Sequence, residues 1–365
     1  MKIGNFLFPD SRDPGQDGTV IDETVQEAVL SDTLGVDVIW LAEHHFDGIC
    51  AYVDPIVFAG ALSVLLKQSR LGFAVVQTSL HHPVRLAEQI AVLDNLLKGR
   101  LIVGLGRGTA YNIYDYQGFG LDHNEAQPRL EEAEQVMLAA WRGGAIDHHG
   151  RFWQLRIPEL RPRPFTRPHP FIIRGASSGA SLIELARTGR PFLMNVQSNE
   201  VTRHRVDLYR REMAAAGYGE EQIATNLEQS WIWRNLFVAD TDAEAERVAV
   251  PAFRAMNESR AAMRERVFAE TGQRIAVPPG DSPERRAAAH GLVRGSPATV
   301  AAAFADIERL GVGGVIASFR LGPLPYEVAA RSLSLFMREV APLFRAPHRN
   351  LGPGNAAVPT LTQPF

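Results

Sequence analysis

The segment LGFAVVQTSLHHPVRLAEQIAVLDNLLKGRLIVGLGRG, residues 71–108, has the pattern of a strand, a helix and a second strand. Its two strand candidates, LGFAVV (71–76) and LIVGL (101–105), are apolar runs of strand length. The apolar residues between them recur every three or four positions, at Leu86, Ile90, Leu93 and Leu97. Pro83 suits the first turn of a helix, and Gly99 suits the position just after its end. The segment therefore predicts a strand–helix–strand unit with parallel strands.

The same alternation runs through most of the chain. Eight segments have the apolar character of buried strands: 2–8, 37–41, 71–76, 101–105, 171–174, 192–196, 231–239 and 314–319. Segments of helical period follow nearly all of them: 19–34, 55–66, a helix from Pro83, 127–141, 179–188, 200–216, 297–310 and 327–340. Eight such units predict an α/β protein with a (β/α)8 TIM barrel.

A single barrel domain over residues 1–346, followed by a tail over 347–365, accounts for the chain if it carries two insertions. Residues 143–170 predict a short hairpin and a proline-rich connection. Residues 251–295 are rich in Arg and Ala and are interrupted by VPPGDSP, so we expect a mobile excursion there and not a second domain.

The composition is that of an ordinary globular protein, with 45% hydrophobic and 22% charged residues and a net charge of −3. No basic stretch predicts binding to nucleic acid, and no apolar stretch approaches the length of a membrane span. Cys50 is the only cysteine, so neither an intrachain disulfide nor a thiolate metal cluster can form. We expect a cytoplasmic protein that acts on small molecules, with neither nucleic acid nor membrane as a partner.

Three titratable residues, Glu43, His44 and His45, follow the second predicted strand in LAEHHFDG (41–48). Adjacent residues of an extended chain point to opposite faces, so the two histidines do not easily chelate one metal ion. A solvated surface loop is the simplest alternative. The end of a barrel strand is, however, where catalytic residues of this fold lie, which favours an acid–base site.

Two glycine-containing segments suggest an anion site. GLGRG (104–108) does not satisfy a dinucleotide-binding fingerprint, but it places Arg107 at a strand end, either as a phosphate ligand or as a surface arginine. In GASSG (175–179), Ser177 and Ser178 lie between a strand and a helix. This segment matches the nucleophile elbow of a serine hydrolase, with Ser177 as nucleophile. The alternative that we favour is a phosphate cradle at a helix N-terminus.

Four segments together resemble the bacterial luciferase-like flavin-dependent monooxygenases, and most closely the catalytic subunit of luciferase. They are MKIGNFLF (1–8), GVDVIWLAEHHF (35–46), residues 71–108 and RGSPATVAAAFADIERLGVGGVIASF (294–319). The resemblance implies a luciferase-like barrel that binds reduced FMN and adds O2 at the flavin C4a position. The peroxyflavin would then oxygenate a small organic substrate by Baeyer–Villiger oxidation or hydroxylation.

Carried over position by position, the resemblance implies His44 as the catalytic histidine, with Glu43 beside it and Asp115 as a further catalytic candidate. It implies a non-proline cis peptide at Ala74–Val75 beneath the isoalloxazine ring. The cofactor-binding residues that it implies are Phe6, Ala74, Val75, Arg107, Tyr111, Ala176, Ser177, Ser178 and Met194. The excursion at 251–295 falls where luciferase has a mobile lid. Gly106 replaces the reactive cysteine of luciferase, which would leave more room beside the flavin.

No NAD(P)H-binding fingerprint is present, so we expect a separate NAD(P)H:flavin reductase to supply FMNH2. Three alternatives remain open: a deazaflavin-dependent oxidoreductase on the same barrel, a serine hydrolase that uses Ser177, and a flavin-storage or partner subunit. The segment PIVFAGALSVLL (55–66) is apolar nearly all round, more than one buried stripe needs. We therefore predict a homodimer.

Overall fold

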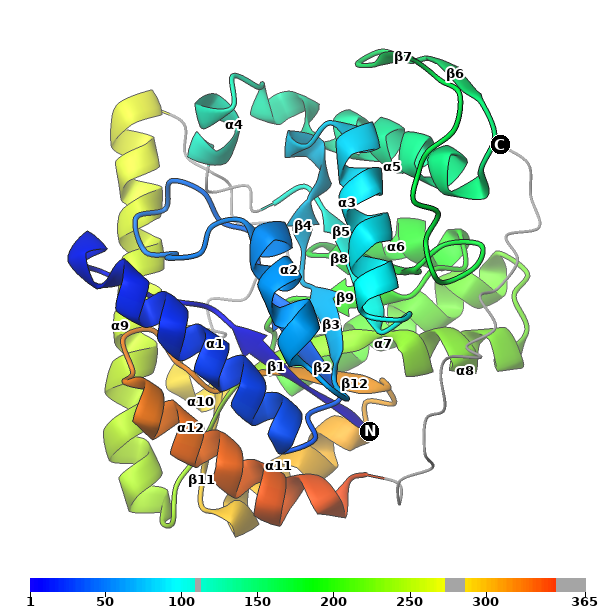
Figure 1. The fold of residues 1–365 in the computed structure, drawn as a ribbon. Coiled ribbons are helices and arrows are strands. Elements are labelled where there is room, and N and C mark those ends of the chain that lie inside the picture. The colour runs from blue at the N-terminus through cyan, green and yellow to red at the C-terminus, as the bar shows by residue number, and fades with distance from the viewer. Residues whose placement is uncertain (109–112, 273–285, 346–365) are drawn as a thin grey trace.

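A computed structural model describes residues 1–108, 113–272 and 286–345. Its centre is a closed barrel of parallel strands in which each strand pairs with the next and the last pairs with the first. The barrel strands are β1 (Lys2–Leu7), β2 (Val38–Leu41), β3 (Arg70–Phe73), β5 (Leu101–Gly106), β8 (Phe171–Ala176), β9 (Phe192–Met194), β10 (Trp231–Val238) and β12 (Gly314–Ser318). The predicted (β/α)8 barrel is thus confirmed (Figure 1).

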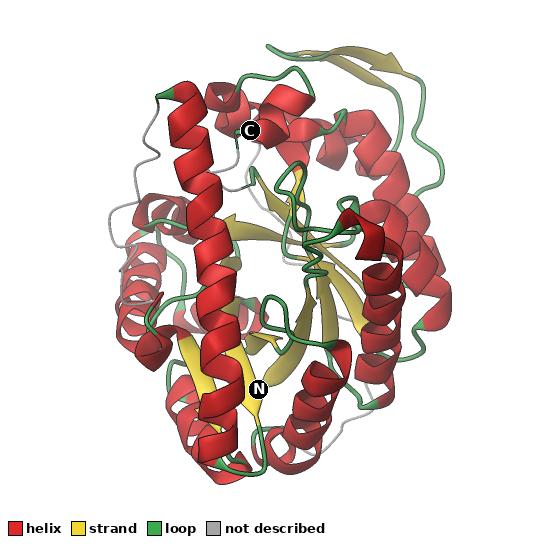
Figure 2. Ribbon diagram, turned by 90° about the vertical axis from the view of Figure 1, so that its left-hand side faces the viewer, coloured by secondary structure: helices red, strands yellow, loops and turns green. Residues whose placement is uncertain are grey.

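Helices surround this barrel (Figure 2). Those that the sequence predicts are α1 (Asp17–Thr33), α2 (Pro55–Leu65), α3 (Pro83–Leu96), α5 (Ala126–Arg142), α6 (Gly179–Arg187), α7 (Asn199–Ala215), α11 (Pro297–Glu308) and α12 (Tyr326–Leu335). Side chains that accept hydrogen bonds from the first-turn amides fix several starts, as Asp54 does for α2 and Ser296 does for α11. The sequence did not predict α4 (Tyr114–Gly118), α8 (Glu220–Gln229), α10 (Ala288–Gly291) or the short strand β11 (Leu292–Gly295).

Side chains alternate between the barrel interior and the layer under the helices. Phe6, Trp40 and Trp231 fill the interior, where the two indole rings meet edge to face at 5.1 Å. Gly4 and Gly72 make room for Trp40, because a Cβ at either position would lie within 2.6 Å of its ring. The interior is therefore packed below the mouth of the barrel.

The first insertion agrees with the prediction. It contains the antiparallel hairpin β6 (Ile146–His149) and β7 (Gln154–Ile157), followed by the proline-rich connection. Glu132 of α5 anchors this hairpin by accepting hydrogen bonds from the Phe152 and Trp153 amides at 3.0 Å each.

The predicted excursion from residue 251 begins within a helix. Residues Asp242–Thr271 form one helix, α9, which continues through Pro251 because the residues around the proline pack against the barrel. Residues 273–285 and the predicted tail lie outside the described residues. Among the described residues, no helix is long and apolar enough to cross a membrane.

Candidate active site

Most of the residues that the sequence singled out lie where barrel strands end, at the mouth formed by the carboxyl ends of the strands. The segment Ala42–His45 leaves β2 there without regular secondary structure, before the turn at Phe46. Ala42 belongs to the apolar interior of the barrel, so alternation directs His44 to the same side and Glu43 and His45 to the opposite side. The structure thus separates Glu43 from His44, which the sequence analysis had placed together.

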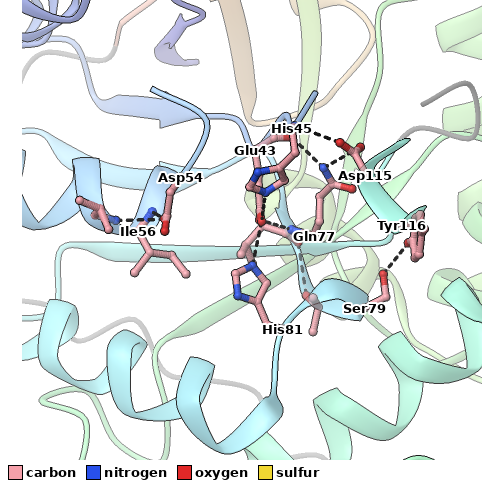
Figure 3. Close-up of polar contacts among 12 residues, drawn as sticks. Glu43, His45, Asp54, Ile56, Gln77, Ser79, His81, Asp115 and Tyr116 are labelled. Atoms are coloured by element: carbon pink, nitrogen blue, oxygen red, sulfur yellow. Dashed lines mark hydrogen bonds and ion pairs between the residues drawn. The ribbon is translucent and has the colours of Figure 1, made fainter. Parts of the chain in front are cut away.

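Glu43 is the centre of a buried hydrogen-bond network (Figure 3). One carboxylate oxygen, Oε1, accepts hydrogen bonds from His45 Nε2 at 2.9 Å and His81 Nε2 at 2.8 Å. The other accepts the backbone N–H of Gln77 at 2.6 Å. Burial alone would raise the pKa of Glu43, but the charge of His81 and these hydrogen bonds lower it to about 2. Glu43 is therefore a carboxylate over the physiological pH range.

Asp115, the first-turn acid of α4, is linked to the same network. It accepts the backbone N–H of His45 at 2.9 Å and the side-chain amide of Gln77 at 3.0 Å. Gln77 also donates to the backbone carbonyl of Glu43 at 3.0 Å, so it bridges the two acids. Burial raises the pKa of Asp115 to about 7 despite these hydrogen bonds. Glu43 and Asp115 therefore differ in charge state near neutral pH.

His44 lies on the other side of the chain, toward the mouth of the barrel. Its ring meets Phe8 edge to face at 5.1 Å, and its Nδ1 is 3.6 Å from the carboxylate of Asp47. Burial lowers the pKa of His44; Asp47 opposes that effect, and Arg260 of α9 adds to it. The neutral imidazole is thereby favoured, which is the form that accepts a proton.

The predicted cis peptide bond is present at Ala74–Val75, between β3 and the two-residue strand β4 (Val76–Gln77). Val75 lies against β5, because a Cβ on Gly106 would be 2.4 Å from its Cγ2. The space that Gly106 was expected to leave open is therefore occupied by Val75. Several apolar side chains at this end of the interior, among them Phe8, Val75 and Trp233, remain half-buried.

These residues fit a flat aromatic ring such as that of a flavin. Phe6 is buried at 4.2 Å from the ring of Trp233, and the half-buried side chains above it present apolar surface. The indole N–H of Trp233 is buried without a hydrogen-bond partner among the described residues. A bound heteroaromatic ring would cover the apolar surface and could accept this N–H.

The two serines lie at the N-terminus of α6. Ser178 caps the helix in a capping box with Ser181, and Ser177 just before it is exposed. Arg205 of α7 is buried beside them, with a guanidinium nitrogen 3.5 Å from the Ser177 carbonyl oxygen. Arg107 is exposed after β5, the strand that pairs with β8. Helix N–H groups, hydroxyls and arginines together suit a phosphate.

This arrangement does not favour a serine hydrolase. No hydrogen bond joins the Ser177 hydroxyl to a histidine within the part of the chain that the structure describes, whereas a serine nucleophile requires such a base. In the same described part, no group of three or more His, Cys, Asp or Glu side chains is arranged to hold a metal ion.

Two of the predicted cofactor-binding side chains face away from the mouth. Ala176 and Met194 pack in the layer between the barrel and its helices, so only their backbones could contact a ligand in the interior. Phe6 does face the interior, and Tyr111 lies outside the described residues. Two members of the Glu43 network, Gln77 and His81, were not among the residues predicted from the sequence. His81 lies in the sequence His-His-Pro just before α3, of which only Pro83 had been interpreted, as a helix start.

Arg205 was missed as well, because it occurs within a helix that carries several other arginines. Only burial distinguishes it from these, and the helical pattern is too weak to predict burial at one position. The sequence therefore located the strand ends that meet at the site, but not all of the side chains that helices bring to them.

Comparisons with known proteins agree with this geometry. The family model of luciferase-like monooxygenases matches residues 1–314. The oxygenase component of flavin-dependent trigonelline monooxygenase from Acinetobacter baylyi is 31% identical over 149 residues, 41% of each chain. The matched segments span about half the length of the curated relatives.

Two solved structures share the fold. Monooxygenase RslO1 from Streptomyces bottropensis has a TM-score of 0.77 and 26% identity, over 94% of this chain and 100% of that one. The oxygenating constituent of 3,6-diketocamphane monooxygenase from Pseudomonas putida, a type II Baeyer–Villiger monooxygenase in complex with FMN, has a TM-score of 0.74 and 22% identity, over 95% and 99% of the two chains. With the family model matching most of its length, the chain belongs to the luciferase-like monooxygenases.

Proposed function

We propose that the protein is the oxygenase component of a two-component monooxygenase, which uses FMNH2 from a separate reductase and O2 to oxygenate a small organic substrate. Baeyer–Villiger oxidation and hydroxylation are the two reactions in its range. The position of His44 carries the proposal. Glu43 and His45, the other two titratable residues of the segment Ala42–His45, face the outer side, whereas His44 faces the interior side of the barrel mouth. The relatives named as monooxygenases support the reaction class.

Reduced flavin, when bound, would supply the electrons that activate O2. The chain would hold the ring over Ala74–Val75 and against Phe8 and Trp233, and its phosphate between Arg107, Arg205 and the N-terminus of α6. In this proposal Ser177 and Ser178 contribute a hydroxyl and helix amides to the phosphate. The apolar walls would exclude water from the reacting atoms.

His44 would act as the proton-transfer residue. With Nδ1 directed to Asp47, Nε2 is the atom left to accept a proton from the reacting group and return it. Glu43 and Asp115 would not touch the flavin in this scheme. They would act as positioning residues, because they hold the backbone and the His45 side chain on the opposite side of the same segment.

Rapid mixing of the protein and chemically reduced FMN with O2 tests the proposal. We expect a transient flavin absorption band that matches neither oxidised nor reduced FMN, and oxygen consumption that depends on added flavin. The same mixing with a reduced deazaflavin is the control for the other cofactor. Absence of the transient band in both the wild type and His44→Ala would reject the proposal, and tight binding of the deazaflavin alone would replace it with hydride transfer.

We further propose that the protein acts as a homodimer through α2 and α3. The side chains of Val57 and Val64 on α2 are exposed to 71% and 63%, and Val92 and Leu96 on the adjacent α3 are exposed to 44% and 45%. An exposed apolar face of this kind on two neighbouring helices is typical of a subunit interface.

A further inference from the structure

Helix α9 carries one apolar stripe, which Arg260 interrupts. Its inward-facing residues are three or four positions apart, except for a gap of seven between Met256 and Met263. They are Ala245, Ala249, Phe253, Met256, Met263 and Val267. Arg260 lies four residues after Met256 and three before Met263, so it continues the stripe and faces the same way. The helix thus turns the guanidinium of Arg260 toward the barrel.

The two halves of the stripe pack on different parts of the molecule. Phe253 and Met256 pack against Phe237 of β10 and Leu321, which follows β12. Met263 and Val267 pack against Ile113, just before α4 and beyond β5, which lies across the barrel from β12. The helix therefore spans the mouth between these two anchors, with Arg260 in the stretch between them. Figure 1 shows the C-terminal end of α9 beside α4.

Arg260 is half-buried, and no hydrogen bond or ion pair joins it to another residue of the described ranges. Its charge nevertheless reaches His44 across the mouth, where it lowers the pKa of that imidazole after the larger effect of burial. A half-buried guanidinium that has lost part of its hydration, and that faces a proton-transfer residue, has unused hydrogen-bonding capacity.

We propose that Arg260 binds a carboxylate group of the substrate and so holds the rest of that molecule beside His44. This inference rests on the proposed function, and it specifies the substrate class as small organic carboxylates. The planar guanidinium can bind a carboxylate through two parallel N–H···O bonds, which fixes orientation as well as position. In the proposed function the phosphate of FMN would lie at the N-terminus of α6, so Arg260 is not needed to bind it.

Binding measurements without turnover test this site. Ligand-observed NMR on the protein with oxidised FMN would compare benzoate with benzamide, and octanoate with octanamide, so that each pair differs in charge and not in size. We expect the wild type to bind at least one carboxylate tenfold or more tightly than its amide. Arg260→Gln should remove that preference, and Arg260→Lys should retain part of it. Arg254→Gln, which changes an exposed arginine of the same helix, should leave the preference intact.

Equal binding of acid and amide, binding of none of the four compounds, or a preference that persists in Arg260→Gln would each overturn the proposal. Weakening of FMN binding by more than about fivefold in Arg260→Gln would also overturn it, because Arg260 would then serve the cofactor. The mixing experiment with reduced FMN is independent of these compounds. A normal transient flavin band without a carboxylate preference rejects the anion site alone, whereas a carboxylate preference without the band supports the site and rejects the monooxygenase reaction.

Discussion

The imidazole of His81 lies 2.8 Å from a carboxylate oxygen of Glu43 that is also bound by His45, and the carboxylate is almost completely buried. Burial by itself would lower the pKa of His81, but the charge of Glu43 outweighs it and raises that pKa. The charged pair fixes the segment after β2 from its outer side. The orientation of His44 on the inner side therefore depends on residues that do not face the reaction.

The first prediction concerns the stability of this pair in acid. The folded pKa of Glu43 is about 2, below its ordinary value of 4.5. Its stabilising contribution is therefore complete above about pH 4.5 and is lost as the pH falls toward 2, by about 3 kcal/mol at 1.4 kcal/mol per pKa unit. Glu43→Gln should remove this component, so that urea denaturation between pH 5 and pH 3 shows a shallower loss of stability than in the wild type. Glu308→Gln, at an exposed position, should follow the wild type. An identical pH dependence for Glu43→Gln would contradict the assignment.

Asp115 should make stability change with pH in the opposite direction. Its folded pKa, about 7, is above its ordinary value of 3.8, so the folded state holds a proton that the unfolded state releases. Stability should therefore fall as the pH rises from about 4 to 7, by up to about 4 kcal/mol. Asp115→Asn cannot ionise, so its stability relative to the wild type should increase between pH 5 and pH 8 in thermal denaturation. A constant difference between the two proteins over that range would show that Asp115 is already ionised at low pH.

Substitution of His44 should affect the reaction, whereas substitution of His45 should affect the stability of the fold. His44→Ala removes the proton-transfer residue of our proposal, and we expect flavin-dependent oxygenation of any accepted substrate to slow by about 10²–10⁴-fold. His45→Ala leaves one oxygen of buried Glu43 with a single imidazole, and we expect a loss of about 1–3 kcal/mol in unfolding free energy. Stopped-flow absorption and urea denaturation on both variants measure these effects. Reversal of the two results would exchange the roles of the histidines.

The phosphate site can be tested with a matched pair of cofactors. Arg107 is exposed, so Arg107→Gln should fold normally and weaken FMN binding by about tenfold through loss of a charge-assisted hydrogen bond. Riboflavin lacks the phosphate, and its weaker binding should be unchanged by the substitution. Fluorescence titration measures both affinities. Equal losses for FMN and riboflavin would place Arg107 at the ring and not at the phosphate.

The sequence predicted the barrel because its periodicities are strong and repeated. The strands are apolar runs, and most of the segments that follow them have helical period, so element type follows largely from spacing. The 30-residue helix α9, which contains Pro251, was not predicted, because the Arg- and Ala-rich segment from residue 251 was interpreted as an excursion. Packing of Phe253 and its neighbours on the barrel outweighs the single amide hydrogen bond that the proline removes, and such tertiary compensation is invisible in a local pattern.

The sequence predicted which strand ends form the site, but it did not predict which side chains contact one another there. Alternation along the extended segment correctly separated His45 from His44, but pairing of Glu43 with His81 depends on how α3 begins beside β4. The hydrogen bond from Gln77 to Asp115 likewise joins two residues that are 38 positions apart in the sequence. Side chains that meet through loops and helix starts cannot be located by the period of either element.

The last prediction concerns the exposed apolar face of α2 and α3. Val57 and Val64 lie about two turns apart on the solvent side of α2, and a dimer interface would bury both. Val57→Glu combined with Val64→Glu would place two charges in that interface, and we expect a dimer to become a monomer because unpaired buried carboxylates are costly. Light scattering at micromolar concentration measures the mass, and circular dichroism verifies that the fold is retained. The matched control is the pair Val29→Glu and Leu343→Glu, which charges exposed apolar positions outside α2 and α3. A monomeric wild type would refute the dimer, and an unchanged mass in the α2 variant would move the interface to another face.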